Sequence, residues 1–149
     1  MATARASSEQ KQILLSYSVE DEEFKEKLVK DLQAENIEVA TSDTIPANPM
    51  ESLQRWSERK CKSTAAVLII MSKEYQTDPE CVEAANAATR LATPRFFSKE
   101  KNFDENEWMK QLRGDSIIYD LSTPNKYKNN LKRLINSLNK LLSMQGITF

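Results

Sequence analysis

The chain has 149 residues, of which 40% are hydrophobic and 29% charged, and its 21 basic and 22 acidic side chains give a net charge of -1. This length and composition are typical of one globular domain. The near balance of charge excludes a general attraction to nucleic acid or to anionic membranes. No apolar run approaches the roughly 20 residues that span a bilayer, so direct membrane insertion is not expected.

Several chemistries are excluded by residue types that the sequence lacks or nearly lacks. It has no histidine, which excludes Ser-His-Asp and Cys-His catalysis and every metal site that needs an imidazole. Its two glycines, Gly114 and Gly146, cannot form a Walker-type phosphate loop or a GxGxxG dinucleotide fingerprint. Two isolated cysteines cannot build a structural zinc site. No metal and no bound cofactor are therefore expected.

The two cysteines, Cys61 and Cys81, also bear on the compartment. A secreted scaffold would usually carry more, so both are interpreted as free thiols in a reducing, cytoplasmic setting. Cys81 follows a predicted helix start, where a thiol is either a small buried side chain or one with a lowered pKa. Residues 1–10 lack the apolar core of a signal peptide and are interpreted as a flexible tail before one domain at residues 11–145.

In chain order, the first predicted element is a short buried strand. The apolar run Ile13–Leu15 ends in Ser16 and Tyr17 and is bounded by polar residues. Ser18 lies three residues before Asp21, and this capping-box spacing predicts a helix start.

The next segment has the apolar period of a helix, and a second strand follows it. The apolar positions recur every four residues, and they are Phe24, Leu28 and Leu32. Asn36 is a suitable C-terminal stop, and Ile37–Ala40 is the predicted strand. Residues 41–50 contain two prolines and no helical period, so we expect a loop there. Asn48-Pro49 with Glu51 then predicts another helix start, because it combines a cap, a first-turn proline and an acid.

Residues 65–71 give the strongest strand signal of the sequence. They are apolar throughout rather than alternating, which is typical of a central parallel strand covered on both faces. Asp78-Pro79 then predicts the start of a helix that continues to about Leu91.

The last third of the chain contains weaker signals and one clear helix. Arg95–Phe97 and Ser116–Tyr119 are strand candidates, with a short helix at Glu107–Leu112 that Gly114 ends. An amphipathic helix is expected from Asn125 onward. Strand and helix thus alternate about five times, which predicts a flavodoxin-like, three-layer α/β fold of about five parallel strands with helices on both faces.

In their order and spacing, these segments resemble the Toll/interleukin-1 receptor (TIR) domain family. The first strand ends in Ser-Tyr and precedes an acid-rich helix start, as in the family's first box, although Gln12 replaces the box's aspartate. The loop after the second strand is similar to the family's Arg-Asp-x-x-Pro-Gly box. Asp43 and Pro46 match it, whereas Ser42 and Ala47 replace its arginine and glycine.

The resemblance continues after the third strand. Ser72 and Tyr75 match the family's Ser-x-x-Tyr, and Cys81 matches the cysteine of a Trp-Cys pair whose tryptophan is Glu80 here. The family's third box, a Phe-Trp pair near the last helix, is absent, and Trp108 lies too early to replace it. The resemblance spans about residues 12–142.

The resemblance implies a non-catalytic module that assembles with other TIR domains, including copies of itself, in innate immune or related intracellular signalling. In the family, the loop after the second strand meets another TIR domain, and Pro46 occupies the proline position associated with that role. Here the implied partner-binding residues are Asp43, Thr44, Ile45, Pro46, Ala47 and Asn48. A proline with fixed φ loses little entropy on docking. From the residues alone, the loop is equally well a strand-to-helix connection that its prolines stiffen.

The alternative that the resemblance implies is NAD cleavage. Some TIR domains split NAD into nicotinamide and ADP-ribose products with a glutamate on the helix after the third strand. A carboxylate suits this reaction because its transition state resembles an oxocarbenium ion. Glu83, or else Glu80, is the candidate. The family spacing, three residues after Cys81, gives Ala84 instead, and one residue turns a helical side chain by about 100°. Both acids are also ordinary in a solvated first helical turn.

A third hypothesis is another small flavodoxin-like protein, such as a nucleoside-processing enzyme. It predicts a ligand pocket at the carboxyl ends of the strands, where the strand order reverses.

Overall fold

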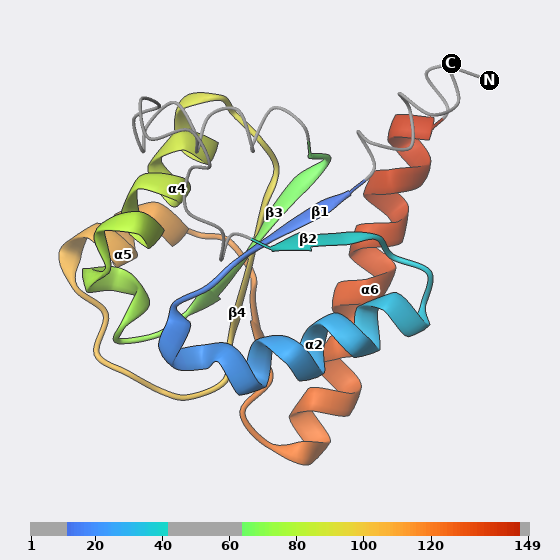
Figure 1. Ribbon diagram of the computed structural model, residues 1–149, viewed down its shortest axis with the longest axis horizontal. Coiled ribbons are helices and arrows are strands. Elements are labelled where there is room, and N and C mark those ends of the chain that lie inside the picture. The colour runs from blue at the N-terminus through green and yellow to red at the C-terminus, as the bar shows by residue number, and fades with distance from the viewer. Residues whose placement is uncertain (1–11, 42–63, 147–149) are drawn as a thin grey trace.

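The computed structural model describes residues 12–41 and 64–146, which form one sheet with helices on both faces (Figure 1). All strand pairs are parallel, in the order β2-β1-β3-β4-β5. The strands are β1 (Ile13–Ser16), β2 (Val39–Thr41), β3 (Ala66–Met71), β4 (Arg95–Lys99) and β5 (Ile118–Asp120). This architecture confirms the predicted flavodoxin-like α/β fold.

The helices divide between the two faces of the sheet, as Figure 1 shows. On one face lie α2 (Glu22–Ala34) and the long α6 (Pro124–Gly146). On the other lie α4 (Pro79–Arg90) and the short α5 (Glu107–Arg113). Two 3-10 turns, η1 (Val19–Asp21) and η2 (Tyr75–Thr77), lead into α2 and α4.

The central position of β3 explains its uninterrupted apolar sequence. All six of its residues are buried, and it pairs with both β1 and β4. Leu68 and Ile70 pack into the core beneath α2 and α6, whereas Val67, Ile69 and Met71 pack into the core beneath α4 and α5. Because both faces are covered, every position of the strand needs an apolar side chain.

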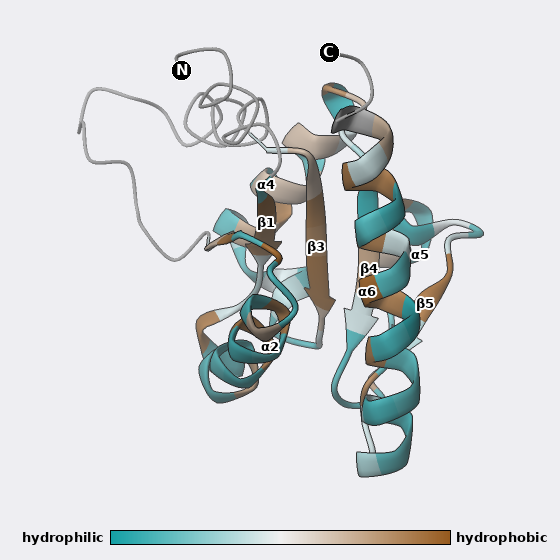
Figure 2. Ribbon diagram, turned by 90° about the vertical axis from the view of Figure 1, so that its right-hand side faces the viewer, coloured by the Kyte–Doolittle hydropathy of each residue, from teal (hydrophilic) through white to brown (hydrophobic). Residues whose placement is uncertain are grey.

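The amphipathic pattern of α6 is equally plain in the structure. Its buried positions follow the helical period, and its outer face is hydrophilic (Figure 2). The buried residues are Leu131, Leu134, Ile135 and Leu138. Within the described part of the chain, no helix is long and apolar enough to cross a membrane.

The two ends of α2 show where local chemistry shifts the predicted boundaries. Ser18 caps a helix start, as predicted, by accepting the Glu20 N–H. That start is the 3-10 turn η1, however, and Asp21, the residue before α2, makes no side-chain cap bond. At the other end Asn36 has a φ of 63°, and the Ile37 N–H donates to the Leu32 carbonyl at 3.1 Å. This Schellman-type ending occupies residues 36–37, so β2 begins at Val39 instead of Ile37.

The start of α4 follows the predicted capping chemistry, and α5 begins with a similar side-chain cap. The Asp78 carboxylate accepts the Glu80 N–H at 3.0 Å, and the Asn106 side chain accepts the Met109 N–H at 2.8 Å. Gly114 ends α5 with a φ of 48°, a conformation that glycine adopts easily.

Candidate functional site

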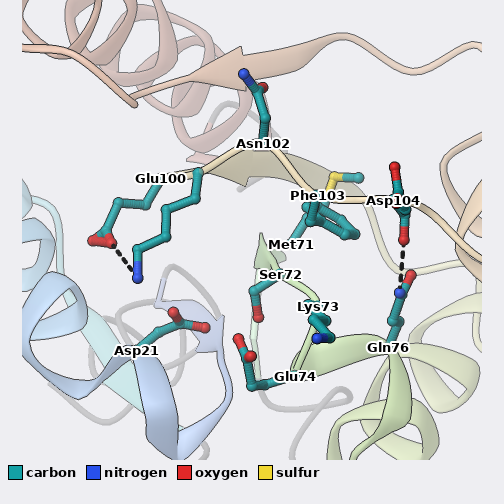
Figure 3. Close-up of a pocket in the computed structure, with 11 residues that line it drawn as sticks. Asp21, Met71, Ser72, Lys73, Glu74, Gln76, Glu100, Asn102, Phe103 and Asp104 are labelled. Carbon is teal, nitrogen blue, oxygen red and sulfur yellow. Dashed lines mark hydrogen bonds and ion pairs between the residues drawn. The ribbon is translucent and has the colours of Figure 1, made fainter.

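A cavity of about 420 Å³ lies at the carboxyl edge of the sheet, beyond the ends of β1, β3 and β4 (Figure 3). Its lining comes from Asp21 in η1, from the segment 71–76 and from the segment 100–104. The chain leaves β1 towards β2 and leaves β3 in the opposite direction, towards β4. The cavity therefore lies where the strand order reverses, which is the usual ligand position in open α/β sheets. The hypothesis of another small flavodoxin-like protein predicts a pocket at this position.

Asp21 carries the least satisfied polar group of this cavity. The residue is 8% exposed, and its Oδ2 atom is buried with no hydrogen-bond partner among the described residues. It occupies the position before α2, but the Ser18 hydroxyl makes the local cap by accepting the Glu20 N–H at 3.3 Å. Figure 3 shows the Asp21 carboxyl group pointing toward Ser72 and into the cavity. Burial raises the pKa of Asp21 above its ordinary value, and the Ser72 hydroxyl opposes that rise in part.

The wall formed by segment 71–76 is fixed by buried hydrogen bonds and ring packing. The Ser72 hydroxyl accepts the Tyr75 N–H at 3.0 Å, and the Tyr75 hydroxyl is bonded to the Ser16 hydroxyl at 2.8 Å. The Tyr75 ring stacks on Trp108 with centroids 6.5 Å apart, and the indole N–H donates to the Asn86 side chain at 3.1 Å. This wall therefore has a defined shape without a ligand.

The opposite wall, segment 100–104, is tied to the first one. The Gln76 side-chain amide donates to the Asp104 carbonyl at 2.9 Å and accepts the Asn106 N–H at 3.0 Å (Figure 3). Just beyond it, Arg113 holds Glu105 through two bonds of 2.6 and 2.8 Å, which lowers the pKa of that carboxyl. The two walls are thus held at a fixed separation.

The charges around the cavity are mainly negative. Its carboxyl groups belong to Asp21, Glu74, Glu100 and Asp104, and its amines to Lys73 and Lys101. The Lys101 amine lies 4.0 Å from the Glu100 carboxylate, and the Lys101 side chain is 79% exposed. Met71 and Phe103 add apolar surface. Across residues 12–41 and 64–146, no three acidic or cysteine side chains are grouped so as to hold a metal ion.

The candidate catalytic acids lie elsewhere, on α4. The Glu83 carboxylate forms an ion pair of 2.7 Å with Arg90, two turns further along the helix. Glu80 is exposed in the first turn. Neither residue lines the cavity. Ala84, at the position where the family spacing expects a glutamate, is 5% exposed and packs into the interior.

Cys81 is a buried thiol, so the alternative of a helix-activated cysteine is wrong. The residue is 5% exposed, and its sulfur donates to the Tyr17 carbonyl at 3.4 Å. Burial, followed by the neighbouring charge of Asp78, raises the pKa of the thiol well above its ordinary value. The thiolate that reacts with electrophiles is therefore suppressed.

We expect Cys81 to resist thiol reagents in the folded protein. In a Cys61→Ser protein, Ellman's reagent at pH 8 should react with Cys81 far more slowly than after unfolding in guanidinium chloride. A Cys81→Ser, Cys61→Ser double variant gives the background. Equal rates in the folded and unfolded protein would contradict the burial of this thiol.

The predicted partner-binding residues are outside the described part of the structure. The whole loop Asp43–Asn48 lies there. Cys61, the second cysteine, also lies outside the described residues. Their assignment stays a prediction from the sequence.

The cavity residues that sequence reasoning misses are Asp21, segment 100–104 and, beside the matched Ser72, the side chains of Lys73, Glu74 and Gln76. The sequence pattern predicts only a capping role for Asp21, and the segment after β4 has no periodicity. One signal was available, because Asp21, Ser72 and Glu100 each follow a strand by a few residues and so meet at one edge of a parallel sheet.

Comparison with known proteins identifies the family. The family model of the TIR domain matches residues 13–135. Among solved structures, the TIR domain of the Toll-related receptor TRR-2 from Hydra magnipapillata superposes with a TM-score of 0.69 at 13% identity, covering 85% of this chain and 97% of that one. The TIR domains of the activated Roq1 resistosome, which directly recognizes the pathogen effector XopQ, give a TM-score of 0.59 at 14% identity, with coverage of 85% and 98%. No curated protein sequence matches. The family match extends over most of the chain, which therefore belongs to the TIR domain family.

Proposed function

We propose that this chain is a non-catalytic interaction module that assembles with other TIR domains in innate immune or related intracellular signalling. The family supports a signalling role, since similar solved TIR domains come from a Toll-related receptor and from an activated resistosome. The proposal places the protein in the cytoplasm, with other TIR domains or further copies of itself as partners.

The observation that carries the non-catalytic assignment is the arrangement of α4. A carboxylate that stabilises a developing positive charge must face the substrate at the moment of bond cleavage. Glu83 is instead held by Arg90 at 2.7 Å, and the position three residues after Cys81 is the buried Ala84. These features favour an assembly role over NAD cleavage.

An assay with NAD tests this assignment directly. Concentrated protein incubated with NAD should release no more nicotinamide than a buffer blank, as followed by chromatography. Glu83→Ala and Glu80→Ala should give the same trace, because neither acid has a catalytic role in this proposal. Nicotinamide release that is lost in Glu83→Ala would establish the TIR-type NAD glycohydrolase instead.

For assembly, we propose the loop Asp43–Asn48 as the contact, with Pro46 at its centre. In light scattering, the unmodified protein should grow in mass with concentration. Pro46→His should prevent this growth, because the substitution removes the fixed backbone angle and the apolar ring of the proline. Pro94→His, at an exposed proline before β4, is the matched control and should assemble normally. Unchanged assembly of Pro46→His would remove this loop from the interface.

A further inference from the structure

The carboxyl group of Asp21 is arranged in a way that folding alone does not require. A buried oxygen without a partner destabilises the folded state, and native proteins keep few of them. Here the Oδ2 atom of Asp21 is buried and unpartnered among the described residues, in a residue that is 8% exposed. The same side chain lines the cavity, beside the Ser72 hydroxyl. Such a group is suited to accept a hydrogen bond from a ligand.

We infer that the cavity between Asp21 and Phe103 binds a small organic cation, an ammonium or guanidinium carried on a short apolar body. The cationic group donates to the Asp21 carboxylate, where a charge-assisted hydrogen bond in a shielded site is strong. The lining as a whole is negative, because its four carboxyl groups outnumber its two amines.

The apolar part of the lining specifies the body of the ligand. Met71 and Phe103 lie among the acidic residues, so the cavity offers both carboxylates and a hydrophobic contact (Figure 3). An aromatic ring also attracts a cation over its face. A bare metal ion would use neither feature, and the described acids are not grouped to ligate one.

The size and rigidity of the cavity favour a small molecule over a macromolecular surface. Its volume of about 420 Å³ lies in the range of small-molecule pockets. The Gln76 bridge to Asp104 and the Ser72 bond to Tyr75 set its two walls beforehand, so little ordering accompanies binding. This assignment is independent of the proposed assembly role.

Titration of the isotope-labelled chain with agmatine, followed by amide NMR, tests the inference. Agmatine carries a guanidinium and an amine on a short alkyl chain, and N-butylurea is its neutral counterpart. We expect agmatine to shift the amide signals of Ser72, Lys73 and Phe103 in a saturable manner, and N-butylurea to shift none of them.

Two variants separate the cavity from general attraction of cations. Asp21→Asn keeps the shape but removes the charge, and it should weaken agmatine binding at least about tenfold. Glu107→Gln removes an acid on α5 whose side chain is 84% exposed, and it should leave the affinity unchanged. An unaltered amide spectrum elsewhere in Asp21→Asn shows that the fold is intact.

Each remaining outcome would overturn the inference. These outcomes are no saturable shift with agmatine, equal affinity in Asp21→Asn, and equal binding of N-butylurea. Shifts with magnesium chloride but not with agmatine would assign a metal site. Binding of a blocked Gly-Arg-Gly peptide without binding of agmatine would assign the cavity to a basic side chain of a partner protein. None of these results bears on nicotinamide release or on the Pro46 contact.

Discussion

Ile69→Ala and Ile70→Ala are each expected to lower the free energy of unfolding by about 2–5 kcal/mol. The two residues are adjacent on β3 and point to opposite faces, and both are 0% exposed. Ile69 packs beneath α4 and α5, while Ile70 packs beneath α2 and α6. Each truncation therefore leaves a cavity in a different core. Denaturant unfolding followed by circular dichroism measures the loss.

The near equality of the two losses is the informative part of this prediction. A sheet with one solvated face would make one substitution costly and its neighbour almost neutral. Ile117→Ala is the control, since that side chain is 72% exposed just before β5 and should change stability by no more than about 0.5 kcal/mol. A neutral Ile69 or Ile70 would refute the three-layer arrangement.

Asp21→Asn is expected to raise the free energy of unfolding by about 1 kcal/mol at pH 7.5, since the buried, unpartnered Oδ2 atom then no longer shares a carboxylate charge. Desolvation by burial raises the pKa of Asp21, and Glu74 and Glu20 add to the rise while Ser72 and Lys101 oppose it. A raised pKa means that the folded state holds the proton more tightly than the unfolded state. The penalty is thus present at neutral pH and fades as the pH falls through the raised value towards about 4. The advantage of the variant should shrink over the same range.

Asp120→Asn provides a control of opposite sign. Hydrogen bonds from Ser122 and the nearby Lys126 lower the pKa of Asp120, so its ionised form stabilises the folded state. This variant should lose stability at pH 7.5, and the loss should stay constant down to about pH 5, above the ordinary carboxyl pKa. Urea midpoints at several pH values measure both variants. Equal pH dependence of the two would refute the environment assigned to Asp21.

Stability gained and binding lost at one residue would mark Asp21 as a functional group. Substitutions at ligand sites frequently stabilise a fold, because such sites hold polar groups ready for a partner. The stability measurement and the agmatine titration use the same variant. Together they distinguish a ligand site from a buried aspartate that binds nothing.

The elements that were predicted well are those whose own sequence determines their burial. The apolar run predicts β3 and its burial on both faces, and the helical period predicts α6 and its buried face. The predictions for the edge strands β2 and β5 begin two residues and end one residue too early, because these strands are short and mostly half-buried. Their limits depend on the turn at Asn36 and on pairing with a neighbouring strand.

The site was less predictable, for a physical reason. The cavity that Asp21 lines is completed by segments 71–76 and 100–104, which lie far along the chain and meet it only in the fold. No local pattern distinguishes this aspartate from a helix cap. The family resemblance points to Glu83, but no sequence pattern predicts the ion pair of Glu83 with Arg90.

The stacking of Trp108 on Tyr75 gives the cavity an optical reporter. The chain has two tryptophans, so a Trp56→Phe protein would emit from Trp108 alone. That indole stacks on the Tyr75 ring, and the Tyr75 backbone N–H donates to the Ser72 hydroxyl in the cavity wall. A charged ligand beside this wall would alter the electrostatic surroundings of the indole, and its fluorescence would then follow occupancy of the cavity in real time without any attached dye.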